Sequence, residues 1–372
     1  MSRARASRPR GAIRLALAAA ALLAAVVAAG CSCVGKPKYE PLHTDSTATV
    51  PVDSLATLVR GAQDAWEQDG EGENAALLSA RLVLNDLVVQ SRIEPTMSWE
   101  DRARALLDSL GIGGEVASDR CALVVNFFSR SNPDQGAWPW LFWCGENAIL
   151  SEPLDARGLK LLALAGRGLW GDPPTPPGPP SVAVLFGRRA SGGQQPLLTA
   201  WDLGGGHPSL SQTLGPDSLG GVGKGEFSAI EDSSIQLTVR AYLPTAGFSE
   251  CGSCPHVWQV RRFLWEPYGF ERISVETQSS PYAVFVQFVQ AITSDDRDRA
   301  KELVVDREWV DTARRLGWHE PGATWRVAPG TEENADEMVF FRSPREAYRV
   351  TFEPRGGEWL ISGFRSTTTS IE

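Results

Sequence analysis

The spacing of hydrophobic residues predicts helices in the first third of the chain. Between Asp53 and Gly111, apolar side chains such as Leu55, Leu58 and Val59 recur every three to four positions, which is the period of a helix. Ser98 is a favourable N-cap for the last of these helices, and Gly111 is a favourable C-terminal stop. Two apolar runs that follow predict buried strands: 121–128 and 141–150.

The middle of the chain shows the two-residue period of strands. Alternating segments joined by short polar turns predict three β-hairpins: 182–186 with 197–201, 226–230 with 235–243, and 257–265 with 270–275. The Gly-rich stretch 203–225 predicts a loop. The segment DPPTPPGPP at 172–180 predicts an extended spacer, because dense proline favours extended backbone.

The last ninety residues predict helices followed by a β-meander. Ser280 caps a helix that Pro281 opens, and a second, shorter helix follows at about 296–305. Four predicted strands come next: 325–327, 337–341, 347–352 and 359–364.

The runs AVFVQFVQAI, DRDRAKELV and YRVTFEPRGGEWLISGF in this region resemble the nuclear-transport-factor-2-like (cystatin-like) superfamily. The resemblance implies a cone-shaped α+β domain with an internal pocket. Its enzymes place Asp and His in that cone, whereas the only His here is His319. The candidate pocket residues are therefore Trp309, Trp318 and His319.

Together these patterns predict an α+β chain with a helical or mixed N-terminal region, a central antiparallel β region and a C-terminal α+β cone-like domain. The predicted boundaries are a signal peptide at 1–30, a lipidated tether at 31–50, a mixed region at 51–171, a Pro-rich linker at 172–180, a β region at 181–277 and the cone-like domain at 281–372.

The first thirty residues have the composition of an export signal. Five arginines precede Leu15, and an uncharged stretch of fifteen residues runs from Leu15 to Ala29. A membrane-spanning helix needs roughly 20 apolar residues, so this stretch is too short to span. A basic head, a short apolar body and small residues before a cut are typical of a secretory signal peptide.

The run Val27-Ala28-Ala29-Gly30-Cys31 resembles the lipobox of bacterial lipoproteins. The resemblance implies cleavage before Cys31 and attachment of lipid to that cysteine. Ordinary cleavage without lipid is the alternative, and Cys33 is a second, less well matched acceptor. Ser32 stands where an Asp would favour inner-membrane retention, so the outer membrane is favoured if the host has one.

Removal of the signal makes the chain more acidic. Lys plus Arg falls from 36 to 31 against 45 Asp plus Glu, so the net charge moves from −9 to near −14. This charge disfavours nucleic acid as a partner. The lipid, rather than electrostatic attraction, is expected to hold the protein at a membrane.

Five cysteines remain after Cys31. In an oxidising compartment the economical pairing is Cys121 with Cys144 and Cys251 with Cys254, which leaves Cys33 in the tether. The Cys251-Gly-Ser-Cys254 motif is also the spacing of thiol–disulfide exchange sites, but it leads into a predicted strand rather than a helix, and a structural disulfide is favoured. Zinc would need a fourth ligand, so no metal and no cofactor is expected.

Thirteen tryptophans offer a candidate binding surface. Trp138, Trp140 and Trp143 cluster in the sequence, and exposed rings of this kind stack on sugars, although large aromatics more often fill cores. The favoured function is a non-catalytic envelope lipoprotein with a binding or structural role, and the expected binding partner is an envelope protein, a glycan or a small ligand. The alternatives are a small-molecule enzyme using the C-terminal pocket and thiol–disulfide exchange at the Cys251 motif.

Overall fold

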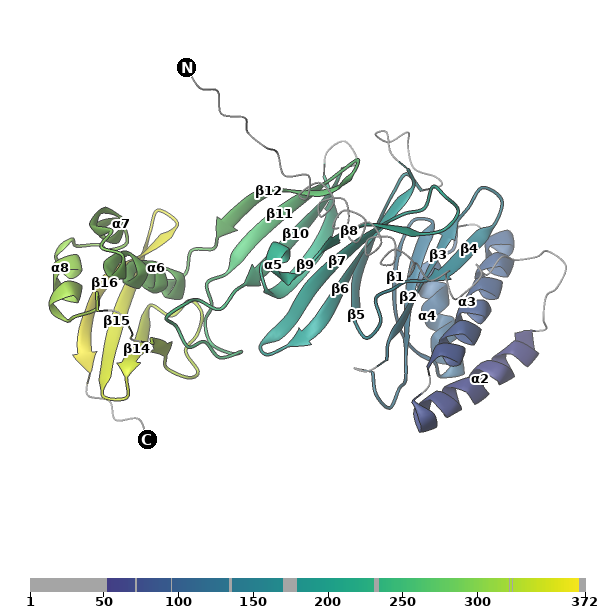
Figure 1. Cartoon of the computed structure of the whole chain (residues 1–372), viewed down its shortest axis with the longest axis horizontal. Helices are drawn as coiled ribbons and strands as arrows, with labels where there is room; N and C mark the ends of the chain where they lie inside the picture. The colour runs from purple at the N-terminus through teal and green to yellow at the C-terminus, as the bar shows by residue number, and fades with distance from the viewer. Residues whose placement is uncertain are drawn as a thin grey trace, which may run out of the picture. The chain divides into compact units, whose positions relative to one another are not determined.

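The computed structural model describes residues 52–367, apart from 71, 95, 134–135, 170–178, 231–233, 321 and 323. The predicted signal peptide, the tether with Cys31 and Cys33, and most of the Pro-rich linker lie outside these described residues. The expected α+β class is wrong, because 43% of the described residues lie in strands and 27% in helices. They form four antiparallel four-stranded sheets, each in chain order (Figure 1).

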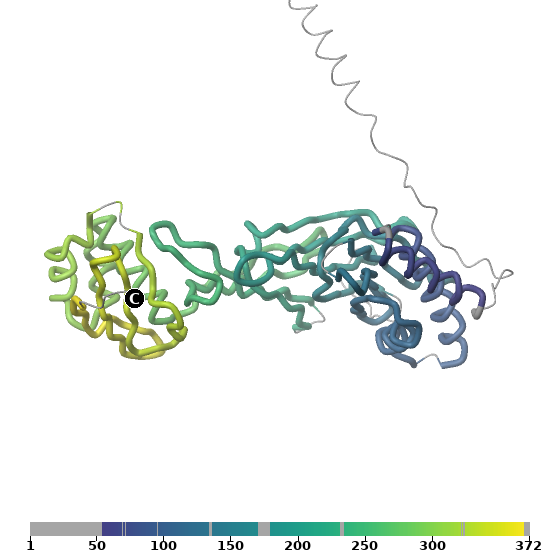
Figure 2. The backbone as a smooth tube through the Cα atoms, turned by 90° about the horizontal axis from the view of Figure 1, so that it is seen from below, coloured from purple at the N-terminus to yellow at the C-terminus, as the bar shows by residue number. Residues whose placement is uncertain are grey.

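The first sheet carries the predicted N-terminal helices on one face. These are α2 (Val52–Asp69), α3 (Glu73–Ile93) and α4 (Trp99–Leu110), and the sheet comprises β1 (Gly113–Asp119), β2 (Ala122–Phe128), β3 (Trp138–Cys144) and β4 (Ile149–Pro153). The start of α4 is as predicted, because the Ser98 hydroxyl accepts the Asp101 N–H at 3.2 Å. Gly111 ends the helix with φ of 72°. The three helices lie together beside this sheet (Figure 2).

Two further sheets follow. One comprises β5 (Lys160–Arg167), β6 (Ser181–Ala190), β7 (Gly193–Asp202) and β8 (Ser209–Leu214); the other comprises β9 (Val222–Ala229), β10 (Ile235–Tyr242), β11 (Gln259–Glu266) and β12 (Gly269–Thr277). A short helix, α5 (Pro216–Leu219), lies between β8 and β9. All three predicted hairpins are confirmed, as β6–β7, β9–β10 and β11–β12. The segment predicted as a linker, 172–180, joins β5 and β6, which are neighbours in one sheet.

Strands β2 and β6 are buried on both faces, and this explains their unbroken apolar runs. In β6, Val182 and Val184 pack with β2 residues in one core, whereas Ala183 and Leu185 pack with β10 and β11 residues in another. In β2, Val124 faces the core shared with β6, and Val125 faces the helices. Alternation of side chains across a strand therefore fills two cores from a single strand.

The C-terminal region contains α6 (Pro281–Thr293), α7 (Arg297–Glu302), α8 (Glu308–Arg315) and the sheet β13 (Arg326–Val327), β14 (Glu337–Ser343), β15 (Glu346–Arg355) and β16 (Glu358–Thr367). The predicted cap is confirmed, since Ser280 Oγ accepts the Ala283 N–H at 3.1 Å. The expected cone, however, is not formed clearly. Aromatic side chains fill the space between helices and sheet, where Phe285 stacks on Phe340 with centroids 3.6 Å apart.

Candidate functional site

Both predicted cysteine pairs are bonded. Cys121 and Cys144, 23 positions apart, lie at the start of β2 and the end of β3 with their Cα atoms 5.6 Å apart. The backbone N–H of Cys144 also donates to the carbonyl of Cys121 at 3.0 Å. This disulfide therefore extends the register of two neighbouring strands by one covalent pair.

The second disulfide, Cys251–Cys254, closes a tight turn in the long connection between β10 and β11. We call residues 243–258 the β10–β11 connection. The Cα atoms of the two cysteines are 5.0 Å apart, and the Cys254 N–H donates to the Cys251 carbonyl at 3.0 Å. The motif is followed by loop and strand β11, so neither sulfur lies at a helix N-terminus, the environment that usually activates a thiolate. The geometry is that of a structural clamp.

The glycine inside this turn is required by a close backbone contact. A Cβ on Gly252 would lie 2.6 Å from the Cα of Gly192, which sits in the β6–β7 turn. Real Cβ atoms do not approach other atoms so closely, so any side chain at Gly252 would push the two turns apart. The disulfide turn is thus seated against the neighbouring sheet.

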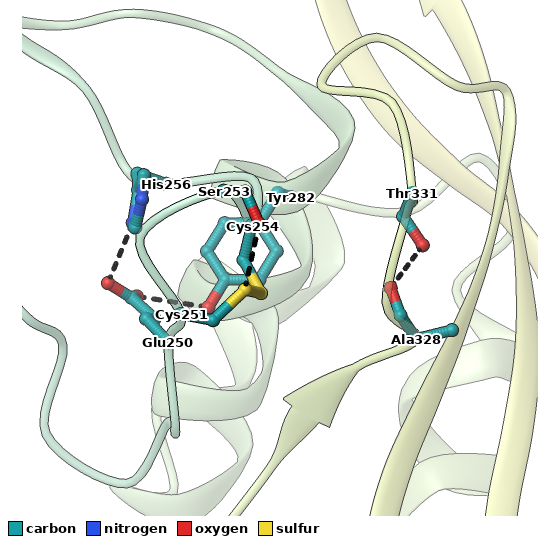
Figure 3. The surroundings of a disulfide bond; sticks show 8 residues. All are labelled: Glu250, Cys251, Ser253, Cys254, His256, Tyr282, Ala328 and Thr331. Atoms are coloured by element: carbon teal, nitrogen blue, oxygen red, sulfur yellow. Dashed lines mark hydrogen bonds and ion pairs between the residues drawn. A yellow bond between two sulfur atoms is a disulfide. The ribbon is translucent and has the colours of Figure 1, made fainter. Parts of the chain in front are cut away.

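A buried polar cluster lies beside the clamp (Figure 3). The Tyr282 hydroxyl donates to Glu250 Oε1 at 3.0 Å, and Nδ1 of His256 lies 3.1 Å from Glu250 Oε2. The side chains of Glu250 and His256 are each only 4% exposed. Burial, and then the charge and hydrogen bond of Glu250, raise the pKa of Tyr282.

His256 is further fixed by stacking. Its ring lies parallel to that of Tyr242, with centroids 3.5 Å apart, and Trp258 approaches edge-on. Within the described residues, Nε2 of His256 has no hydrogen-bond partner. The described residues also contain no group of three or more His, Cys, Asp or Glu able to hold a metal ion. The cluster joins the β10–β11 connection to α6 and β10.

The same connection is anchored to the C-terminal core through its backbone. Trp325 donates its N–H to the Gly247 carbonyl at 2.8 Å, and its own carbonyl accepts the Ser249 N–H at 2.7 Å. Between these two bonds, the ring of Phe248 is buried edge-on against Tyr282 and Phe285. Backbone hydrogen bonds to Trp325 therefore hold the connection on both sides of the buried Phe248 ring.

A groove of about 680 Å³ opens beside this anchored connection. One wall comes from the connection and the adjoining ends of β11 and β12, and the other from α6, α7 and the start of β16. Its lining residues include Leu243, Thr245, Gln259, Thr277, Ser279, Gln287, Gln290, Arg299, Glu302, Glu358 and Trp359. Grooves of 300–1,000 Å³ are typical of small-molecule sites. The predicted site residues did not include any of these side chains.

The predicted N-terminal ligand tryptophans are used mainly for packing. Trp140 and Trp143 are buried in the two cores on either face of the first sheet. Trp138 is half-buried, and the guanidinium of Arg157 lies 3.8 Å from its ring centroid.

The three candidates for a C-terminal pocket are not gathered around a cavity. Trp318 is 1% exposed and stacks on Phe364 within the aromatic core. Trp309 is half-buried against Phe364, whereas His319 is exposed to solvent. The alternative of a small-molecule enzyme depended on an open pocket among these residues, and aromatic side chains fill that space.

In the part of the chain that the structure describes, no helix is long and apolar enough to cross a membrane. Comparison with known protein families, with curated proteins and with solved structures finds no match to this chain.

Proposed function

We propose that this chain is an exported, lipid-anchored protein of the bacterial cell envelope. It binds a small ligand in the groove beside the β10–β11 connection and does not catalyse a reaction there. The signal-like segment and Cys31 provide the export and the anchor. The near −14 charge of the processed chain, from 31 basic and 45 acidic residues, leaves the lipid as the membrane contact.

The observation that carries the proposal is the pairing of four cysteines into two disulfides in the described residues. Such bonds persist in oxidising compartments and are rare in the cytosol. One of them clamps the connection that forms a wall of the groove, so the two parts of the proposal support each other. That wall is held in place by a disulfide, a buried polar cluster and the buried Phe248 ring. A binding site benefits from such preorganisation, because less conformational freedom is lost on binding.

The anchor is tested by expressing the full chain in a Gram-negative host with a labelled fatty acid. We expect Cys31→Ser to abolish labelling and leave the protein unprocessed. Cys33→Ser is the matched control and should keep both label and cleavage. Labelling that survives Cys31→Ser but not Cys33→Ser would move the acceptor to Cys33, and an unlabelled, uncleaved wild-type chain would refute the anchor altogether.

The membrane is tested separately by fractionation. We expect wild-type protein in the outer-membrane fraction and Ser32→Asp in the inner-membrane fraction. Equal distribution of the two proteins would contradict the expectation that Ser32 directs the outer-membrane location.

A further inference from the structure

We propose that the groove takes a neutral saccharide. This inference rests on the proposed binding function and names its ligand class. Four features of the lining indicate this ligand class: two oriented amides, the balance of charge, an apolar wall and the bonded edge of strand β16.

Two glutamine amides line the groove from opposite walls, and arginines fix their orientation. Arg261 Nη2 donates to Gln259 Oε1 at 2.9 Å, and Arg299 Nη2 donates to Gln287 Oε1 at 2.6 Å. An arginine N–H can only donate, so each amide must turn its oxygen toward the arginine. The remaining polar group of each side chain is an NH₂ donor, for which the described residues show no partner. The groove therefore offers two oriented NH₂ donors, open to water in the free protein, to which an acceptor of a ligand can bind.

The charge of the lining disfavours anions, and its two amide donors disfavour a cation that has no acceptor. The lining holds two acids, Glu302 and Glu358, against one base, Arg299, so its net charge is negative and disfavours an anion. The single lining cation, Arg299, is paired with Glu302 at 2.8 Å. An ammonium ligand has only donors, and these cannot satisfy the NH₂ groups of the two amides. The ligand is consequently neutral and rich in hydrogen-bond acceptors.

Apolar and hydroxyl groups complete the lining. Trp359, Leu243 and Val257 provide hydrophobic surface, while Thr245 and Thr277 provide hydroxyls that both donate and accept. A saccharide combines these needs, because its hydroxyls accept and donate and its C–H face packs against an aromatic ring. The volume of about 680 Å³ suits a short oligosaccharide.

A peptide fits less well at β16, because the edge of this strand in the groove is already bonded. Extended peptides usually bind by adding a strand to a free edge. The edge of β16 here is occupied, since the Trp359 N–H donates to Ser279 Oγ at 3.1 Å. Ile361 next to it donates to the Leu303 carbonyl and accepts from the Val305 N–H, both at 2.9 Å.

The test uses the full chain in a zwitterionic detergent, because detergents with sugar heads would compete. Maltotriose, triacetylchitotriose and the peptide trialanine are each titrated to about 10 mM by ligand-observed NMR, a range that covers millimolar affinity. We expect at least one trisaccharide to bind. Gln259→Leu and Gln287→Leu should each weaken that binding about fivefold, the loss of one hydrogen bond. Gln90→Leu, on α3 away from the groove, is the matched control and should bind like wild type.

Three results overturn the inference. They are no binding of either trisaccharide, binding unchanged in the double variant at Gln259 and Gln287, and tighter binding of trialanine than of both sugars. Circular dichroism of each variant shows that a loss of binding does not come from unfolding. Binding of the peptide alone would refute the saccharide and leave a binding groove, whereas sugar binding by a chain that carries no lipid would refute the anchor and keep the saccharide.

Discussion

Removing one hydroxyl group from the buried cluster should weaken the whole fold measurably. In Tyr282→Phe the ring stays in the aromatic core, where Tyr282 is 1% exposed, and only the donor to Glu250 is lost. The Glu250 carboxyl group is itself buried, so solvent cannot replace the missing hydrogen bond. The variant therefore isolates the bond that ties the β10–β11 connection to α6.

We expect the variant to lose about 2 kcal/mol of unfolding free energy at neutral pH, the range for a hydrogen bond to a buried carboxyl group. The measurement is a urea titration followed by tryptophan fluorescence and near-UV circular dichroism. Tyr268→Phe is the matched control, because Tyr268 is 97% exposed, and it should change the free energy by less than about 0.5 kcal/mol. Equal stabilities of the two variants would refute the stabilisation that we assign to the Tyr282–Glu250 hydrogen bond.

Comparison of wild type with Tyr282→Phe also gives a pH dependence of stability with a definite sign. The structure raises the pKa of Tyr282, whereas an unfolded tyrosine titrates near 10. The hydroxyl therefore contributes its full stability below about pH 10, and this is lost as the pH rises further, because only the unfolded state then ionises. Wild type should lose about 1 kcal/mol more than Tyr282→Phe between about pH 10 and 11. A gap between the two proteins that stays constant or widens over this range would contradict the buried position of the hydroxyl.

Two further predictions concern the disulfides and the hydrogen bonds that Arg167 donates to backbone carbonyls. Replacing both cysteines of the Cys121–Cys144 pair by serine should lower the free energy of unfolding by about 3 kcal/mol, and the same change at Cys251–Cys254 by about 2 kcal/mol. The first loss is larger because the longer loop gains more chain entropy in the unfolded state. Urea titrations that gave the reverse order would refute this ranking. Arg167→Leu should lower the free energy of unfolding by about 3 kcal/mol and speed amide hydrogen exchange in the β11–β12 turn. The reason is that buried Arg167 donates to the carbonyls of Glu266 at 2.7 Å and Pro267 at 3.0 Å. Unchanged exchange would show that the arginine does not hold that turn.

Local patterns in the sequence were sufficient for most elements. The alternation in 257–265, with a short turn before 270–275, predicts the hairpin β11–β12, and Ser98 and Ser280 mark two helix starts that the structure confirms. These signals are local because a cap or a turn is built from residues a few positions apart. The economical pairing of the five cysteines after Cys31 is confirmed by the two disulfides of the structure.

Some strands gave no readable pattern. Residues 203–225 were expected to be a loop, yet they contain β8, α5 and the start of β9. Most residues of β8 are exposed and polar, so no apolar period marks this strand. The apolar run 159–165 has no period that distinguishes a helix from a strand, and the structure places most of it in β5.

The sequence by itself determined the two helix starts at Ser98 and Ser280 and the three hairpins, because a cap or a hairpin depends on neighbours along the chain. It favoured the two cysteine pairs without fixing them. Only the tertiary structure decided that the strands form four separate sheets, that β2 and β6 each serve two cores, and that aromatic rings fill the C-terminal region. It alone also brought together the groove, whose walls come from residues 243–259, 277–303 and 358–360. A two-residue period in the sequence indicates the two faces of a strand. The surface that covers each face depends on packing between segments that are far apart in the chain.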